Sequence, residues 1–314
     1  MKTCVLTLLS IASALCGVWP AEAQVQPLDN KPLAFSPAGS NGFTFDTGVL
    51  RGNLRAEGKS KGLSSVAHLP TGMTLDRSMG LFGHYRVFSA NQRYGTGAWD
   101  WPSEARLQPD GSVEVRWPAA ADRPFELRAT YRWATPTVLD VVTTVAAKTN
   151  LSKFESFLAC YFAPEFTNSL VYVDGLPDKP EGKAFMPAEK ERGTWLAFPR
   201  DDSAGPIFRD GRWTFQPSPV EWVLMPRLAR PLGVRRAQAV GLAAVLMSPP
   251  NDCFAVCTPQ QTESHYSMYL SLFGRDLKAG EIARARARLM IASKFSDAQI
   301  AQAYEDYLTE ADGK

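Results

Sequence analysis

The sequence is poor in cysteine, in histidine and in net charge. Five cysteines and three histidines occur in 314 residues, and 34 Lys+Arg stand against 32 Asp+Glu, which leaves a formal net charge of +2. This balance excludes non-specific attraction to nucleic acid as a basis of function. The cysteines have no matching histidine cluster of the kind that binds zinc. We therefore expect no nucleic-acid partner, no cofactor and no metal.

Long apolar runs are also absent after residue 23, and a membrane-spanning helix needs about 20 apolar residues. The first residues instead combine Lys2, an uncharged run at 4–18 and the small-x-small pattern at 21–23. This pattern predicts a signal peptide, residues 1–23, that is cleaved before Gln24. A membrane anchor is the alternative. We expect a periplasmic or extracellular protein with no membrane association after cleavage.

Cleavage leaves Cys160, Cys253 and Cys257. In an oxidising compartment Cys253 and Cys257 could pair and close a very short loop. If both lie on one strand, they are too far apart to be bridged. The sequence leaves both possibilities open.

The rest of the chain has the pattern of an all-β protein. Residues 24–41 predict an irregular lead-in, 42–293 a β domain and 294–314 a C-terminal helix. Apolar and polar residues alternate at 112–117 and 125–133, as half-buried strands require. Asp110-Gly111 and Asp210-Gly211 have the composition of tight hairpin turns. Further strands are expected at 81–89, 139–147, 156–162, 219–225, 237–248, 253–258, 265–273 and 281–292.

The C-terminal helix has its own start signal. Ser296 is a good N-cap, and Gln299 completes a capping-box pattern. The next apolar residues recur at helical spacing and predict a face that docks on a sheet: Ile300, Ala303, Tyr304, Tyr307 and Leu308. Many strands and one helix favour a large two-sheet antiparallel supersandwich.

Part of this pattern resembles a known superfamily. The stretch DGSVEVRWPAAADRPFELRATYRWATPTVLDVVTTVAAKTNLSKFESFLACYF is similar to the central strands of the galactose-mutarotase-like β-supersandwich, and LKAGE at 277–281 resembles the entry to its last strand. That superfamily includes aldose epimerases, sandwich domains of polysaccharide lyases and some glycoside hydrolases. The resemblance implies this fold and a carbohydrate ligand.

The epimerase chemistry does not carry over with the pattern. In that family a proton-transferring His stands just before the Tyr-Phe pair that matches Tyr161-Phe162, and a Glu precedes a Pro late in the chain. This chain has Ala159 and Cys160 at the first position and Thr258 at the second. Other residues must therefore carry any catalysis.

We identify candidate site residues where imidazole, guanidinium, indole and carboxyl groups gather. If 81–89 is a strand, His84, Arg86 and Phe88 share one face and Tyr85 and Val87 the other. His84 and His265 are the candidate proton-transfer groups, with Glu263 as partner of His265 because the two share a face by parity. The candidate substrate-binding residues are Arg86, Arg93, Trp99, Asp100 and Trp101.

Packing is the alternative for both tryptophans, and a role as a surface or core residue is the alternative for each histidine. Arg227, Arg230, Arg235 and Arg236 lie in a segment broken by Pro and Gly. They predict either contact with an acidic polysaccharide or a solvated loop.

The sequence therefore supports an exported protein that holds a sugar or polysaccharide on the concave face of a supersandwich. It leaves open whether the protein is an enzyme of the lyase, hydrolase or epimerase kind. The alternative is a non-catalytic periplasmic binding or assembly module on the same fold. A metalloenzyme built on the histidines is a third, weaker reading.

Overall fold

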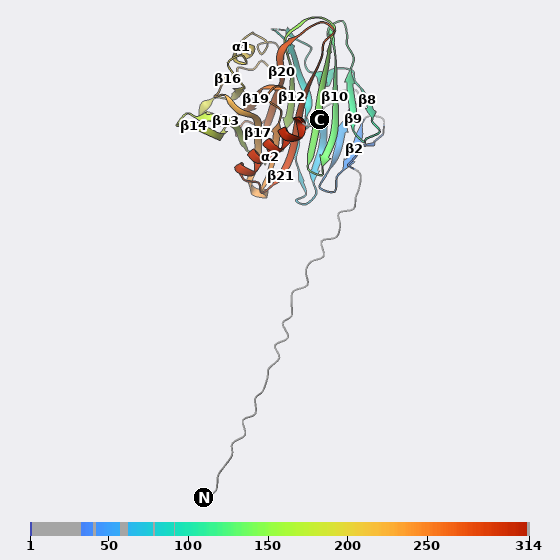
Figure 1. Ribbon diagram of the computed structural model, residues 1–314. Coiled ribbons are helices and arrows are strands. Elements are labelled where there is room, and N and C mark those ends of the chain that lie inside the picture. Colours follow the sequence, from blue (N-terminus) through green and yellow to red (C-terminus); the bar gives the residue numbers. More distant parts are fainter. Residues whose placement is uncertain (2–32, 40–41, 57–61, 78, 91, 313–314) are drawn as a thin grey trace. The chain divides into compact units, whose positions relative to one another are not determined.

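Strand alternation and one capped helix account for most of the architecture (Figure 1). The computed structural model describes residue 1 and residues 33–39, 42–56, 62–77, 79–90 and 92–312. The expected signal peptide and most of the lead-in lie outside the described residues. Residues 31–314 form one compact unit, to which all the described strands and helices belong.

Three antiparallel sheets form the unit, with one parallel pair at an edge. The N-terminal sheet has the order β1-β2-β3-β4-β5: β1 Ser36–Pro37, β2 Phe43–Asp46, β3 Leu50–Arg55, β4 Gly62–His68 and β5 Met73–Thr74. The helix-bearing sheet has the order β14-β13-β17-β18-β21-β11-β10-β9-β8: β8 Glu104–Leu107, β9 Val113–Trp117, β10 Phe125–Thr135, β11 Val138–Ala147, β13 Asn168–Leu176, β14 Lys179–Pro187, β17 Leu228–Ala237, β18 Leu242–Met247 and β21 Ile282–Ser293. The aromatic sheet has the order β16-β15-β19-β20-β12-β6-β7: β6 Gly83–Ser89, β7 Gln92–Arg93, β12 Leu151–Tyr161, β15 Trp195–Pro199, β16 Val223–Leu224, β19 Cys253–Pro259 and β20 Ser267–Leu277.

The core lies between two layers. The inner face of the helix-bearing sheet supplies side chains such as Trp117, Leu127 and Tyr131, and the aromatic sheet supplies Leu158 and Leu270 opposite them. The N-terminal sheet continues the second layer, since Phe45 packs against Trp133 of β10 with ring centroids 4.7 Å apart. An all-β supersandwich with a C-terminal helix is therefore confirmed.

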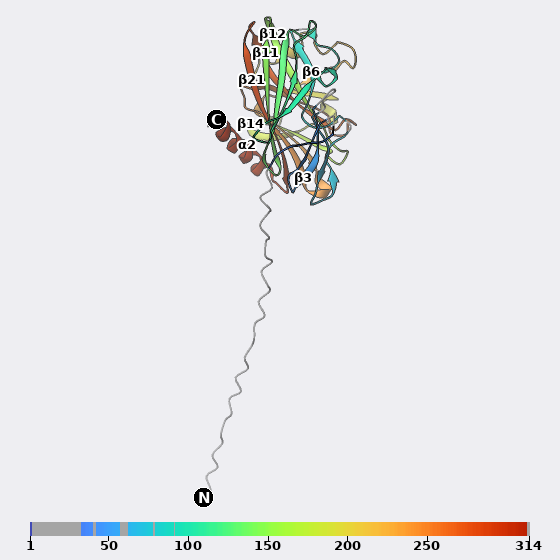
Figure 2. The same cartoon turned by 90° about the vertical axis from the view of Figure 1, so that its right-hand side faces the viewer.

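The helix α2, Asp297–Asp312, covers part of the outer face of the helix-bearing sheet (Figure 2). Ile300, Tyr304 and Tyr307 pack on Val234 and Met290, as the apolar spacing predicts. The capping box is confirmed, because the Ser296 backbone N–H donates to Gln299 Oε1 at 2.9 Å and the Gln299 N–H donates to Ser296 Oγ at 3.3 Å. The remaining helices are short: α1 Gly205–Phe208 and the 3-10 turns η1 Ala98–Asp100, η2 Lys190–Arg192 and η3 Gln238–Val240.

Removing this cap gives a testable loss of stability. We expect Ser296→Ala to lower the free energy of unfolding by about 1 kcal/mol, because the Gln299 N–H loses its acceptor. Urea unfolding should show a lower midpoint with an unchanged slope. Thr309→Ala, at an exposed position in the same helix, is the control and should cause no comparable loss. Equal midpoints for Ser296→Ala and the wild type would show that the cap contributes nothing.

Several local predictions are wrong. The expected strand 237–248 is the end of β17, the turn η3 and then β18, and 219–225 contains only the two residues of β16. Asp210-Gly211 follows α1 and joins no paired strands, whereas Asp110-Gly111 does lie in the β8–β9 hairpin.

Three of the four arginines of the predicted cluster, Arg230, Arg235 and Arg236, lie in a strand. Residues 228–237 form β17, so the prediction of a solvated loop is wrong for this segment. Arg235 is wholly buried, and its guanidinium donates to the carbonyls of Phe166, Ser267 and Pro259. Burial lowers the pKa of Arg235 to about 10, which leaves it charged at neutral pH. Arg235 therefore ties the two sheets together and is closed to ligand.

Candidate functional site at the rim of the aromatic sheet

A histidine–carboxylate pair lies in the turn between β19 and β20. His265 Nδ1 and Glu263 Oε1 are 2.8 Å apart, and Glu263 Oε2 accepts the His265 backbone N–H at 2.8 Å. The pair forms locally because two residues of one turn fold back on each other. The His265 side chain is 52% exposed and that of Glu263 15%. A carboxylate that accepts from Nδ1–H leaves Nε2 as the proton acceptor, so the pair can act as a general base.

Aromatic rings surround His265 on the side of the sheet. Its ring centroid lies 5.5 Å from that of Trp195 and 6.3 Å from that of Tyr161. The Tyr161 hydroxyl accepts from Tyr269 at 3.5 Å, and Ser267 donates to Tyr269 at 2.6 Å. Burial raises the pKa of Tyr161 and raises the pKa of Tyr269 to about 12. Both phenols therefore keep their protons at neutral pH, and Tyr269 donates its own to Tyr161.

Arg77 holds the turn in place from the N-terminal sheet side. Its Nη1 donates to the Ser264 carbonyl, and its guanidinium lies 5.9 Å from the centroid of the Tyr266 ring. The Arg77 backbone N–H also donates to the Tyr161 carbonyl at 2.9 Å. The same residue thus fixes both the turn that carries the pair and the strand end that carries Tyr161.

The middle of this sheet face is covered by the chain itself. Residues 200–222 cross it and place Phe208, Trp213 and Trp222 over the sheet, where Trp213 packs 4.9 Å from Phe157 and 4.8 Å from Phe88 between ring centroids. We call residues 200–222 the covering segment. Because this segment covers the centre of the sheet, the part of this face that stays open to a ligand is the rim at His265.

Arg86 and Arg93, two predicted substrate-binding residues, contact the covering segment. Arg86 Nη2 donates to the Ser218 carbonyl at 2.5 Å, and Arg86 lies 5.1 Å from the Trp213 ring centroid. Arg93 Nη1 donates to the Pro217 carbonyl at 2.8 Å. Both guanidinium groups therefore have main-chain partners from the same segment.

His84 lies on the opposite side of the sheet from Arg86, so the prediction that the two share a face is wrong. The pairing of β6 with β12 shifts by one residue between His84–Leu158 and Val87–Ser156. This β-bulge breaks the alternation, and Tyr85 and Arg86 both reach the aromatic face. His84 points into the core, 2.9 Å from Ser156 Oγ and 3.3 Å from Thr143 Oγ1.

The burial of His84 decides its protonation. It is 1% exposed, and burial lowers its pKa to about 3. A neutral imidazole in the sandwich core cannot reach a ligand on either outer face.

The predicted tryptophan pair divides between two clusters. Trp99 stacks on Tyr85 at 4.1 Å between ring centroids on the aromatic face, whereas Trp101 packs in the core 6.0 Å from Phe125. Both tryptophans are buried, so neither offers an open face to a sugar. Asp100 is exposed and accepts from Thr96 Oγ1 at 2.6 Å.

The positions that correspond to the epimerase acid and base hold no group that could replace them. Ala159 faces the aromatic cluster, and Cys160 faces the core, where burial raises its thiol pKa. Thr258 is buried, and its Oγ1 donates to the Ser267 carbonyl at 3.1 Å. The side chains at these positions cannot exchange protons with a substrate at neutral pH.

Sequence reasoning found Glu263 and His265 but missed Trp195, Tyr269 and Arg77 as their neighbours. Tyr161 appeared only as part of a strand pattern. Trp195 begins β15, about 70 residues before His265, and nothing in its local sequence points to the turn. Among the described residues, no three His, Cys, Asp or Glu side chains lie close enough to hold a metal ion. Within the same residues, no helix is both long and apolar enough to cross a bilayer.

Known proteins resemble this chain in structure only. No protein-family model matches the sequence, and no curated protein sequence matches it. The fold is similar to that of galactose 1-epimerase from Lactobacillus acidophilus NCFM, with 9% identity over 81% of this chain and 95% of the other and a TM-score of 0.50. It is also similar to α-N-acetylgalactosaminidase NagBb from Bifidobacterium bifidum, with 11% identity over 85% of this chain but 39% of the other and a TM-score of 0.51. The Slr1438 protein from Synechocystis sp. PCC 6803 gives 12% identity over 80% and 94% of the two chains and a TM-score of 0.50. The galactose-mutarotase-like fold is thereby confirmed.

Proposed function

We propose that this chain is an exported protein that handles carbohydrate at the rim of the aromatic sheet. The observation that carries the proposal is the contact of 2.8 Å between His265 Nδ1 and Glu263 Oε1, next to Trp195 and Tyr161. The structural similarity to proteins named as an epimerase and a glycosidase supports a sugar ligand. The N-terminal leader pattern supports export.

Each group has a role in this proposal. His265 Nε2 takes a proton from the sugar, and Glu263 orients the imidazole and stabilises its charged form. Tyr161 is buried and lies beside the imidazole on the side of the sheet. The Trp195 ring provides an apolar wall beside the sugar. The substrate enters from the side of the turn, because the covering segment fills the centre of the sheet.

A non-catalytic binding module is the second candidate. Two observations favour it, namely the closed centre of the sheet face and the absence of titratable side chains from positions 159 and 258. The two candidates share the same rim and differ in whether a product forms.

The test combines a binding assay and a product assay on a panel of monosaccharides and polysaccharides. For the enzyme, His265→Ala should lower turnover by about 10²–10⁴-fold, the usual contribution of a general base. Glu263→Gln should lower turnover less, because the imidazole keeps a hydrogen-bond partner. Ser264→Ala, at an exposed position in the same turn, is the matched control and should leave turnover unchanged.

Three outcomes separate the candidates. Product formation that is lost in His265→Ala supports the enzyme. Binding by the wild type without product from any sugar supports the module. A wild-type protein that binds no carbohydrate rejects both.

A further inference from the structure

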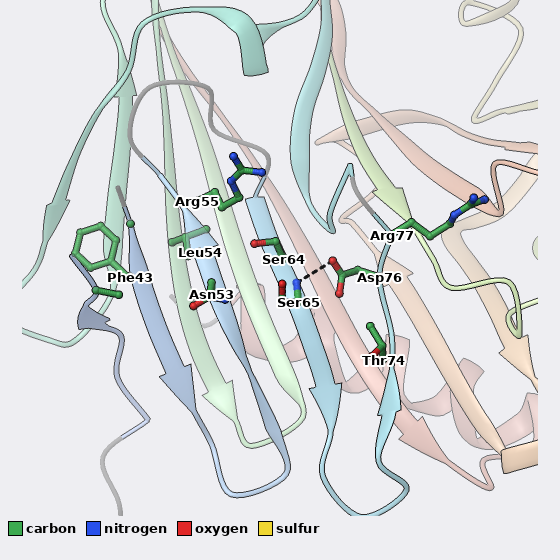
Figure 3. Close-up of a pocket in the computed structure, with 11 residues that line it drawn as sticks. Phe43, Asn53, Leu54, Arg55, Ser64, Ser65, Thr74, Asp76 and Arg77 are labelled. Carbon is green, nitrogen blue, oxygen red and sulfur yellow. Dashed lines mark hydrogen bonds between the residues drawn. The ribbon is translucent and has the colours of Figure 1, made fainter. Parts of the chain in front are cut away.

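A polar groove crosses the outer face of the N-terminal sheet. Two neighbouring hollows of about 730 Å³ and 620 Å³ are both lined by Asn53 and Ser65. Along β3 and β4 the apolar side chains Leu54 and Leu63 point into the core. The outward positions therefore carry the polar residues that Figure 3 shows. Each hollow has the size of a small-molecule site, so together they suit an extended ligand.

The polar side chains of the larger hollow are not engaged with one another, whereas in the smaller hollow Arg51 Nη2 contacts Asp46 Oδ2 at 3.1 Å. Within the described residues, no hydrogen bond or ion pair involves the side chains of Asn53, Arg55, Ser64, Ser65 or Thr74. On the outer face of the helix-bearing sheet, by contrast, several arginines are paired. There Arg116 contacts Glu126 at 2.6 Å and Arg288 contacts Asp140 at 2.6 Å. Hydroxyl, amide and guanidinium groups on the groove are thus available to a ligand.

The charge of the larger hollow favours an anion. Asp76 is 9% exposed, and its carboxylate already accepts the backbone N–H groups of Ser65 at 2.9 Å and Val66 at 2.6 Å. No acidic side chain pairs with Arg55 in the described part of the chain. A carboxylate is the natural partner of a free guanidinium. In Figure 3, Arg55 and Arg77 lie on either side of Ser64 and Asp76.

The groove also leads towards the rim site. Arg77 lines the larger hollow, and its guanidinium donates to the Ser264 carbonyl, one residue from His265. A ligand that extends past Arg77 reaches the turn that carries the His265–Glu263 pair.

We propose that this groove binds a stretch of an acidic oligosaccharide built of uronate residues, and that the same chain continues to His265. Arg55 pairs with a uronate carboxylate, and Asn53, Ser64 and Thr74 bind its hydroxyls. The proposal rests on carbohydrate handling at the rim and specifies the ligand as acidic and longer than one residue.

Binding calorimetry with defined sugars tests it. The probes are tetragalacturonate, tetramannuronate, galacturonic acid and a neutral galactotetraose. The wild type should bind at least one acidic tetramer more tightly than galacturonic acid and than the neutral tetramer. Arg55→Gln should lower the affinity for that tetramer about tenfold and reduce the salt dependence of binding, because one charge-assisted contact is lost.

Two further variants complete the design. Asn53→Trp places an indole between the two hollows and should weaken tetramer binding more than Arg55→Gln does, with a smaller loss of affinity for galacturonic acid, which occupies one hollow only. Arg106→Gln removes the same charge from an exposed position on β8 and should change neither affinity. Thermal melts of each variant establish that the fold is intact.

The outcomes distinguish the groove from the rim. If the tetramer binds tightly and neither Arg55→Gln nor Asn53→Trp weakens its binding, the groove is rejected. The proposal for the rim is then unaffected. Equal affinity for acidic and neutral tetramers rejects the acidic ligand. A wild type that binds no probe and no other carbohydrate rejects the groove together with carbohydrate handling at the rim.

Discussion

Arg212→Met is expected to destabilise the fold by about 3–5 kcal/mol, because it leaves the buried carboxylate of Glu155 without its partner. The Arg212 side chain is fully buried, and its Nη1 donates to Glu155 Oε2 at 2.8 Å. Its Nη2 donates to Asp210 Oδ2 at 2.8 Å and to the Lys153 carbonyl at 3.0 Å. Burial acts to lower the pKa of Arg212, but Glu155 and Asp210 outweigh that effect and raise it. Chemical unfolding measures the loss.

The position of Arg212 makes this loss informative about the covering segment. Arg212 comes from the segment and Glu155 from β12, so the pair is the charged link between them. Limited proteolysis should cut within 200–222 much faster in Arg212→Met than in the wild type. The double variant Arg212→Met with Glu155→Leu should regain part of the stability, since no charge is then left unpaired. A loss below about 1 kcal/mol in the single variant would contradict a buried ion pair.

Acid is expected to destabilise the protein through His84. Burial lowers its pKa from 6.5 to about 3, so the folded state holds this imidazole neutral while the unfolded state protonates it below pH 6.5. The unfolded state thus binds more protons between pH 6.5 and about 3, and stability falls as the pH falls. Within this window His84 alone contributes a slope of up to about 1.4 kcal/mol per pH unit.

Replacing His84 with a side chain that does not titrate isolates its contribution to the pH dependence of the free energy of unfolding. His84→Gln should flatten the decline in the free energy of unfolding between pH 6.5 and 4, whatever its effect at neutral pH. Thr309→Ala, at an exposed position and without any change of titratable group, is the control, and it should keep the wild-type slope. Parallel pH profiles for His84→Gln and the wild type would show that His84 is solvated or charged in the folded state.

Local signals predicted the elements that depend on neighbouring residues. The Ser296–Gln299 cap needs only one turn of helix, and the alternation in β9 and β10 needs only a strand with one buried face. The Glu263–His265 contact was predictable for the same reason, since both residues lie in one turn.

Elements that depend on distant partners were not predictable. The segment of β17 was predicted as a possible loop because its arginines suggested solvent exposure. The carbonyls that accept hydrogen bonds from Arg235 lie 69 and 32 residues away in the chain, so the local sequence gives no sign of its burial. The bulge in β6 cannot be predicted from the local sequence, because it depends on the register with β12. A shift of one residue moves His84 to the other face of the sheet. Trp99 was predicted as a sugar platform, but Tyr85 already covers its ring. Trp195 and Tyr161 meet His265 only once the sheet has formed.

The three described cysteines are unpaired and wholly buried, and they do not all lie on the same face of the aromatic sheet. Cys253 packs in the core between the sheets, whereas Cys257, four residues later on β19, packs among the aromatic side chains on the other face. The register of β19 with β20 shifts between Cys253 and Ala255, which accounts for the change of side. These three thiols can neither cross-link nor meet an external oxidant while the chain stays folded, so the fold of the described residues does not depend on whether the surroundings are reducing or oxidising.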